Sequence, residues 1–559
     1  MHIHRSSLES LEPRIAPARI LGSGIGAHTE SLVPAGGAVA TQFDISSDGK
    51  AATWVNTDGD TVSLAITKGK LKPANFDLTT DSATGEVTVN LFDISAAKFG
   101  AKFQGTSIDV KIAAPSTTGF ADIRAINAKG IDVGRVTVGG DLGQIDAGDA
   151  DLSTPAIRRL QVGQMGFFGV AGQIAGQDTM SKIRGPVVKL QLDELLSAFI
   201  NVVGGSAGSI DQISIGTMDG AREEAMFDGS VRASGPIGEV SVGGEGGVSI
   251  AGGVGDFSGV IWSRKSTGQV LVAGDLVGGD GFYSGAIFAG NPDKANPPLA
   301  GKIGPVTIHG SILGGAGDFS GTLYSDTKVK AVAVDGSVVG GDGMLSGSIV
   351  SGGGFAGISI GGNLESSTGG QSGSIVAFNG DAPSITIEGQ IVAGNFAQSG
   401  IHINGFLGTL SFASAPHVDG QAIDVRALLG VGSIMVTGDM NDLFVLAGYD
   451  ADGFPRTGNV SIGTVNIGGA FAGGGLLAGA GPGEDGITFT EDDVLIKPDP
   501  FPSIISKISN VIVGGEFNPF AIEAERLDAI SIAGQSVKLT AGKHNDDFLI
   551  GDTIIKEVS

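Results

Sequence analysis

The chain is 559 residues long, with 96 glycines and only 6% aromatic residues, a composition that favours one elongated repeat structure over several compact domains. Its formal net charge of −25 disfavours a nucleic-acid partner at most surfaces, and the absence of cysteine excludes disulfides and thiolate metal sites. No run of about 18 apolar residues exists, so we expect no membrane-spanning helix.

Residues 1–37 read as an irregular segment with little apolar character. The stretch Leu8-Glu9-Ser10-Leu11-Glu12-Pro13-Arg14 resembles the N-terminal LEPR-XLL sorting-type motif of large exported proteins in planctomycete and verrucomicrobial bacteria, although Ile15-Ala16-Pro17-Ala18 replaces its double leucine. The resemblance implies export and an extracellular or cell-surface location in a bacterium. The alternative is a disordered tail.

Residues 38–127 carry no repeat but alternate as strands do at 52–55, 61–66, 86–91 and 107–112. The turn Asn56-Thr57-Asp58-Gly59-Asp60 is a strong hairpin signal. We expect a small β domain that also caps a coil, because a bare strand edge invites aggregation.

Together with Trp54 and the later run Gly139-Gly140-Asp141-Leu142-Gly143-Gln144-Ile145-Asp146, this turn is similar to functionally uncharacterised glycine-rich repeat proteins of the same bacterial groups. That resemblance implies no particular activity.

A repeat dominates residues 128–540 and is cleanest from Gly235 to Gly400. Ser-Gly pairs begin at Ser258, Ser284, Ser320, Ser346, Ser372 and Ser399, in steps of 26, 36, 26, 26 and 27 residues. The long step contains the insertion 291–298, which is polar and rich in proline. Each copy opens with an aliphatic-x-aliphatic triplet, at residues 240–242, 270–272, 306–308, 332–334, 358–360 and 385–387.

In most copies a second aliphatic residue lies four positions after the triplet, as Leu276 and Ile312 do, and a third lies two positions after the Ser-Gly glycine, as Ile287 does. Hydrophobic residues at such fixed intervals are not typical of a disordered chain. Three short strands per copy cannot bury their apolar sides alone, so the copies must stack.

The repeat therefore predicts an all-β fold, a right-handed parallel β-helix of about 26 residues per rung, where a rung is one copy of the repeat. Only residues 193–200 suggest a helical turn, on the outside of the coil. Residues 541–559 are expected to form a C-terminal cap strand.

A catalytic site should bring together a general acid and a general base. The carboxylates that recur in register lie in glycine-rich turns, and Arg264-Lys265 is the only adjacent basic pair of the clean array. No acid-base pair can be assembled from the sequence, so we expect no enzyme activity. The recurring carboxylates are Asp256, Asp280, Asp318 and Asp342.

Calcium is the more plausible small partner, because hard cations prefer oxygen-rich turns. The alternative for each candidate turn is a solvated loop without a metal. The candidate ligands are Asn56, Asp58 and Asp60, then Asp450 and Asp452, and more weakly Glu484, Asp485, Glu491, Asp492 and Asp493. No cofactor other than calcium is expected.

One column of the repeat, three residues after the Ser-Gly glycine, holds Trp262, Phe288 and Tyr324. If the aliphatic residue before each points inward, these rings point outward and could stack on sugar rings or pack on a protein partner. The alternative is that each ring folds under a corner of its rung.

The sequence thus favours a non-enzymatic, exported, structural or adhesin-like protein whose partners are glycans or other surface proteins. One alternative is a polysaccharide-active lyase or hydrolase, which would need at least two carboxylates and a basic residue converging in a groove. A second alternative is a self-assembling homo-oligomer of a surface layer or filament.

Overall fold

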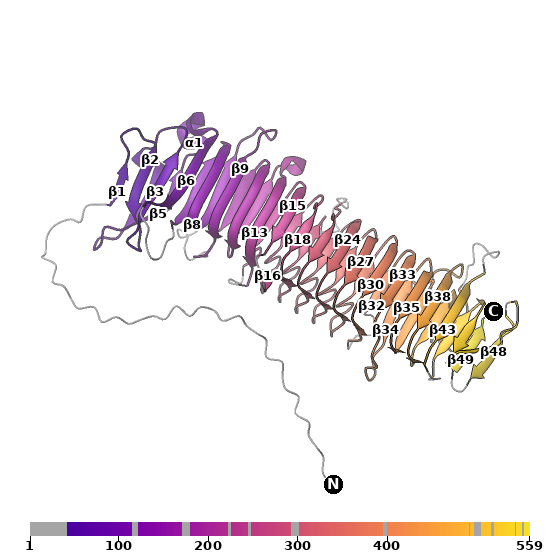
Figure 1. Ribbon diagram of the computed structural model, residues 1–559. Helices are drawn as coiled ribbons and strands as arrows, with labels where there is room; N and C mark the ends of the chain where they lie inside the picture. Colours follow the sequence, from indigo (N-terminus) through magenta and orange to yellow (C-terminus); the bar gives the residue numbers. More distant parts are fainter. Residues whose placement is uncertain are drawn as a thin grey trace, which may run out of the picture. The chain divides into compact units, whose positions relative to one another are not determined.

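The computed structural model describes residues 42–113, 121–169, 179–221, 225–243, 247–291, 301–394, 400–490, 492–496, 505–515, 519–542, 544–550 and 553–558. Thr41–Ser559 form one compact unit, in which a single, mostly parallel sheet contains nearly all the strands (Figure 1). Helix in the described part is limited to α1 (Ala96–Phe99) and short 3-10 turns such as η4 (Gly205–Ala207). The predicted all-β class is confirmed. The export-type segment 1–37 lies outside the described residues.

The N-terminal strands are antiparallel. β2 is joined to β3 through the turn Asn56–Asp60, so the predicted hairpin is confirmed. The sheet becomes parallel where β6 pairs with β8 and β5 with β7. The strands are β1 (Phe43–Ile45), β2 (Ala51–Val55), β3 (Thr61–Ile66), β4 (Phe76–Thr80), β5 (Val87–Asp93), β6 (Thr106–Ile112) and β7 (Ile123–Lys129).

Long strands follow, and each pairs in parallel with the equivalent strand of the next rung. The helical turn expected at 193–200 is wrong, because Leu195 ends one strand and Phe199 begins the next. Leu190, Leu192 and Leu195 face the core, and pairing on both sides outweighs local helix preference. The strands are β8 (Val133–Gly148), β9 (Ile157–Met165), β10 (Met180–Arg184), β11 (Val187–Leu195), β12 (Phe199–Val203) and β13 (Ile210–Asp219).

In the clean array each rung contributes one strand to each of three parallel ladders. The first ladder contains the triplets, in β15 (Ile237–Val242), β18 (Val270–Val272), β21 (Val306–Ile308), β24 (Val329–Val334), β27 (Phe355–Ile360) and β30 (Ala382–Ile387). The second contains β16 (Val248–Ala251), β19 (Asp275–Val277), β22 (Ile312–Leu313), β25 (Val338–Val339), β28 (Leu364–Glu365) and β31 (Ile391–Val392).

The third ladder follows the Ser-Gly turns. Its strands are β14 (Ser230–Ala233), β17 (Ile261–Ser263), β20 (Ile287–Ala289), β23 (Leu323–Ser325), β26 (Ile349–Ser351), β29 (Ile375–Ala377) and β32 (Gly400–Ile403). The predicted aliphatic columns pair as expected, for example Ile287 with Leu323. The 36-residue step does not disturb the register, since Val270 still pairs with Val306 across it. Residues 292–298 of the insertion lie outside the described residues.

Most of the later strands keep the parallel pairing. The pairs β41 with β42, β46 with β47, and β48 (Asp547–Ile550) with β49 (Thr553–Glu557) are antiparallel, and β49 also pairs in parallel with β44. The strands between are β33 (Leu407–Phe412), β34 (Ile423–Ala427), β35 (Val431–Val436), β36 (Met440–Asn441), β37 (Leu443–Ala447), β38 (Ser461–Ile467), β39 (Phe471–Ala472), β40 (Gly475–Ala478), β41 (Ala480–Gly481), β42 (Val494–Leu495), β43 (Lys507–Val513), β44 (Ala521–Ala524), β45 (Arg526–Leu527), β46 (Ile530–Ile532) and β47 (Gln535–Ser536).

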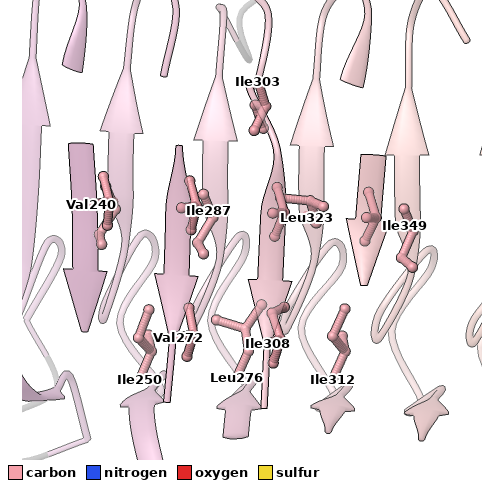
Figure 2. Close-up of a cluster of buried hydrophobic side chains, with 14 of the residues drawn as sticks. Val240, Ile250, Val272, Leu276, Ile287, Ile303, Ile308, Ile312, Leu323 and Ile349 are labelled. Carbon is pink, nitrogen blue, oxygen red and sulfur yellow. The ribbon is translucent and has the colours of Figure 1, made fainter. Parts of the chain in front are cut away.

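The core is one continuous cluster of mainly aliphatic side chains that runs from Ala52 to Ile555. In the array it is built from the inward residues of all three ladders, such as Val272, Leu276 and Ile287, which gather between the strands (Figure 2). Each rung thus buries its apolar side against its neighbours, and parallel strands stack about 4.8 Å apart.

Candidate functional site

The predicted aromatic stripe is in register but covered. Trp262 pairs with Phe288, and Phe288 with Tyr324, in the third ladder. All three point away from the main core into a second cluster, as the period of two requires. Their exposed fractions are only 6%, 2% and 8%, so these rings form no open binding surface. The alternative interpretation, that each ring folds under a corner, describes what is found. We call this outward column of the third ladder the strand column.

A second column of side chains, in the Ser-Gly turns, covers the strand column. We call it the turn column. Phe257 lies 5.5 Å from Trp262 between ring centroids, and Tyr283 lies 5.2 Å from Phe288. Along the column, Phe257, Tyr283 and Phe319 stack at 5.6 and 4.8 Å. Its members are Phe227, Phe257, Tyr283, Phe319, Leu345 and Gln371.

Every residue of the turn column has a positive φ, between 53° and 66°, which is uncommon for residues other than glycine. Such a conformation costs on the order of 1 kcal/mol and persists only where the surroundings fix it. In five of the six turns the next residue is a serine that fixes it, whereas Phe227 is followed by Asp228. The Ser258 hydroxyl accepts a hydrogen bond from the Gly253 amide at 2.8 Å, and Ser284 does the same for Gly279 at 2.9 Å. The turn therefore folds back over its own strand in each rung.

The recurring carboxylates connect one turn to the next. Asp256 Oδ1 accepts a hydrogen bond from the Phe282 amide at 3.0 Å, and Asp318 Oδ1 accepts one from the Met344 amide at 2.8 Å. Asp342 instead accepts a hydrogen bond from the Thr368 hydroxyl, whereas Asp280 is exposed. In the described part of the array these carboxylates stabilise turns and do not converge on a site.

Towards the C-terminal end the strand column becomes polar. Val376 pairs with His402, His402 with Arg426, and Leu477 with Glu523. His402 is fully buried, and neither ring nitrogen has a hydrogen-bond partner in the structure. Burial, and then the charge of Arg426, lowers the pKa of His402 to about 3, so the ring is neutral near pH 7.

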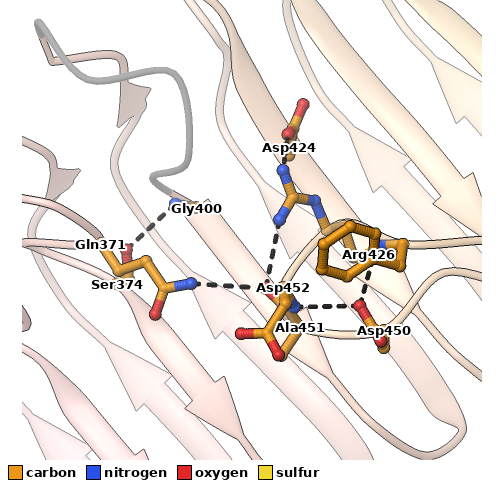
Figure 3. Close-up of polar contacts among 9 residues, drawn as sticks. Gln371, Ser374, Gly400, Asp424, Arg426, Asp450, Ala451 and Asp452 are labelled. Carbon is orange, nitrogen blue, oxygen red and sulfur yellow. Dashed lines mark hydrogen bonds and ion pairs between the residues drawn. The ribbon is translucent and has the colours of Figure 1, made fainter. Parts of the chain in front are cut away.

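A loop that follows β37 covers this polar part from above. The Ala451 carbonyl accepts hydrogen bonds from Arg426 Nη1 at 3.1 Å and from Gln371 Nε2 at 3.3 Å (Figure 3). The Ala451 amide donates to Asn404 at 2.6 Å. Arg426 also pairs with Asp424. One loop thus reaches back across several rungs and replaces the local turn as a cover.

The same loop contains two predicted calcium ligands. Asp450 Oδ1 accepts the amides of Asp452 at 3.1 Å and Phe454 at 2.8 Å, and its Oδ2 pairs with Arg456 Nε at 2.6 Å. The Asp452 side chain is exposed. Both oxygens of Asp450 are therefore engaged in holding the loop, and a calcium ion would have to displace Arg456.

The other candidate turns are also organised by their own amides. Asn56 Oδ1 accepts the amides of Asp58 at 3.1 Å and Asp60 at 2.8 Å, which closes the hairpin. Asp492 accepts the amide of Asp485 at 3.0 Å, and Asp493 accepts that of Phe489 at 2.5 Å, while Glu491 lies outside the described residues. Within the described ranges no group of three histidine, aspartate or glutamate side chains could hold a metal ion.

Sequence reasoning missed a cavity of about 320 Å³ between the N-terminal hairpin and the first rungs. Asp122, Arg124 and Asp141 line it, with Trp54 and the exposed Phe168 among the other walls. Asp122 Oδ1 accepts the Asp141 amide at 2.8 Å, so the two acidic residues are adjacent. No repeat pattern could have revealed them, because they lie 19 residues apart and meet only through parallel pairing of β7 and β8.

The carboxyl groups of this cavity are shifted towards the protonated form. Burial raises the pKa of Asp141 to about 7, with a smaller contribution from the charge of Asp122. Burial also raises the pKa of Asp122, helped by Asp58. Asp141 Oδ1 additionally accepts the Phe167 amide at 2.8 Å, the same rung-to-rung bond that Asp256 makes, so part of its role is structural.

No protein-family model, curated protein or solved structure matches this chain. Among the described residues no helix is long and apolar enough to cross a membrane.

Proposed function

We propose that this protein is an exported or cell-surface, non-enzymatic scaffold of structural or adhesin-like type, built as a right-handed parallel β-helix. The observation that carries the proposal is the closed outer wall of the array. Where many binding or catalytic solenoids would offer an open surface, the strand column here is buried under the turn column, rung after rung. A long outer face without an open binding surface is suited to a rigid spacer that displays another part of a protein or assembly. The resemblance of the N-terminal segment to the LEPR-type motif supports export.

Fractionation of the source cells tests this proposal. The intact chain should be recovered in the envelope or the medium, and atomic force or electron microscopy of the purified protein should give uniform, unbranched rods. Recovery of the intact chain in the cytoplasm would contradict the exported role. Flexible or globular particles would contradict the scaffold role independently.

A second candidate, a polysaccharide-active enzyme, is favoured by one observation. Asp122, Asp141 and Arg124 line one cavity, and a carboxyl group with a pKa of about 7 is suited to proton transfer near neutral pH. The test is release of reducing or unsaturated sugar ends from a panel of polysaccharides. Activity lost in both Asp141→Asn and Asp122→Asn, but kept in the exposed-site control Asp280→Asn, would favour the enzyme over the scaffold.

A further inference from the structure

A second pocket, of about 530 Å³, lies on the outside of the third ladder where β12, η4, β14 and the end of β17 meet. Three cationic residues line it, Arg232, Arg264 and Lys265, and no acidic side chain is among its described lining residues. In a chain with 59 acidic and 34 basic residues, this is a local reversal of charge. The other lining residues are Asn201, Val203, Gly204, Gly205, Ser206 and Ser234.

The ladder register brings the two arginines together. β12 pairs with β14 so that Asn201 is beside Arg232, and β14 pairs with β17 so that Arg232 is beside Trp262. Arg264 directly follows Ser263, the partner of Ala233. The guanidinium groups therefore come from adjacent rungs of one ladder, which stack about 4.8 Å apart.

Arg232 is held in place by stacking. Its guanidinium carbon lies 4.2 Å from the centre of the Trp262 ring, which is itself buried. The residue is half-buried, and burial, followed by the charge of Arg264, lowers its pKa. Two like charges are thus fixed near each other in a partly desolvated place, an arrangement that is unfavourable unless an anion compensates it.

The structure supplies no such anion. Across the described residues Arg232, Arg264 and Lys265 make no ion pair, and Arg264 Nε is buried without a hydrogen-bond partner. By contrast, Arg426 pairs with Asp424. Because Arg264 Nε is enclosed, the groups of the described lining left to meet an external anion are the other guanidinium nitrogens and the Lys265 ammonium group.

We propose that this pocket, the Arg232 pocket, binds the carboxylate of an acidic sugar. Arginine forks match a planar carboxylate with two parallel hydrogen bonds, which favours an oxyanion ligand. Asn201 and Ser206 add hydrogen-bonding groups for hydroxyls around that anion, and the Ser234 oxygen, whose hydroxyl donates to the Gly205 carbonyl at 2.9 Å, can still accept. The proposal does not depend on where the protein is located or on whether it is an enzyme.

Nucleic acid fits this pocket less well. Single strands bind through exposed aromatic platforms as well as cations. No aromatic side chain is among the described lining residues, and Trp262 is buried beneath Arg232. The net charge of −25 also repels a densely charged polymer more than a ligand with one charge per sugar.

The test is isothermal titration calorimetry of the full chain at low salt with galacturonate, glucuronate and mannuronate and their short oligomers. At least one should bind, and galactose, which offers hydroxyls without a carboxylate, should not. Binding should weaken when salt is raised, because the pocket is open enough for charges to be screened. Failure of all the uronates would overturn the proposal, and so would equal binding of galactose.

Variants locate the binding. Arg264→Gln and Arg232→Gln should each weaken uronate binding by about tenfold or more, as expected for loss of a charged hydrogen-bond donor. Lys330→Gln, which removes an exposed cation on β24, should leave it unchanged. Because Arg232→Gln also removes the stack on Trp262, thermal unfolding is measured in parallel, and Arg264→Gln decides the outcome if that variant unfolds. Unchanged affinity in Arg264→Gln would overturn the assignment.

Acetate and inorganic sulfate serve as the competing probes. Each should bind more weakly than the best uronate, since neither offers ring hydroxyls to Asn201 and Ser234. If either binds as tightly, the pocket is a general anion site and the assignment to an acidic sugar is wrong.

Discussion

The two halves of the strand column have the same parallel strand pairing but contain side chains of different chemical character. From Trp262 to Tyr324 the column is aromatic, and each rung covers it with its own turn. From His402 to Glu523 it holds three polar residues and two leucines, and a loop that contains Ala451 covers it at Arg426. The difference teaches that backbone pairing and the inward aliphatic residues specify the coil, whereas the outward column is free to vary provided that something covers it.

Removing one ring should damage the aromatic half most. Phe288 is 2% exposed and contacts Trp262, Tyr283 and Tyr324, so Phe288→Ala should cost about 3 to 5 kcal/mol of unfolding free energy. Phe282→Ala, at a ring that is 38% exposed, should cost about 1 kcal/mol or less. Urea unfolding followed by tryptophan fluorescence measures both, since Trp262 lies in the column. Equal losses would mean that the covered column contributes little.

The turn that covers the aromatic half should be the next most sensitive element. A Cβ at Gly285, where φ is 60°, would lie 1.9 Å from the Val277 carbonyl oxygen. We expect Gly285→Ala to cost about 2 to 3 kcal/mol, from backbone strain and from displacement of the turn. Gly59→Ala is the matched control, because Gly59 also has a positive φ but its Cβ would meet nothing within 4 Å. Similar melting temperatures for the two variants would be inconsistent with a turn fixed by close approach.

The polar half should respond to pH. Burial, and then Asp493, raises the pKa of Glu523 to about 9 from an ordinary value of 4.5. The folded chain therefore keeps a proton that the unfolded chain loses, so this stabilisation is complete below pH 4.5 and is lost as pH rises through 9. Glu523→Gln should flatten the decline in stability between pH 5 and 9 by about 2 kcal/mol. The exposed Glu388→Gln should retain the parental profile, and a parental profile in Glu523→Gln would refute the assignment.

The smallest expected effect comes from replacing a polar residue of the strand column by an apolar one, which tests whether the polar half tolerates the apolar side chains of the other half. Because His402 follows Val376 in the column and has no hydrogen-bond partner for either ring nitrogen in the structure, His402→Leu should be neutral or stabilise the fold by about 1 kcal/mol at pH 7. The lowered pKa of His402 gives stability that is present above pH 6.5 and is lost as pH falls towards 3, so the gain should grow on acidification. A loss at pH 7 in thermal unfolding would show that the polar half has its own packing requirement. Glu388→Gln again serves as the control.

The parallel ladders could be predicted because the residue pattern that specifies them is local and repeated. Val270, Leu276 and Ile287 occupy fixed places in each rung, and burial of such residues decides which side of a strand faces inward. The direction of Trp262 followed from the same alternation. The burial of Trp262 could not be predicted in this way. It depends on the positive φ of Tyr283 and its neighbours, which the pattern of side chains does not predict.

The candidate sites were less predictable than the fold. Asp122 and Asp141 meet through the pairing of β7 with β8, and Arg232 meets Arg264 through the pairing of β14 with β17. Residues that are neighbours in adjacent rungs are separated by a variable number of residues in the sequence. Contacts between their charged side chains therefore cannot be predicted until the strand register is known. The adjacent residues Arg264 and Lys265 could be recognised in the sequence as a basic pair, but the third cationic residue of the pocket, Arg232, could not.

The step of 36 residues between two Ser-Gly pairs leaves the stacking of Val270 on Val306 and of Ile287 on Leu323 intact. The length of one rung is therefore independent of the strand register: residues can be added at this corner without shifting the pairing between neighbouring rungs. A reporter peptide inserted between Asn291 and Gly301 should therefore leave the pairing of the flanking strands unchanged.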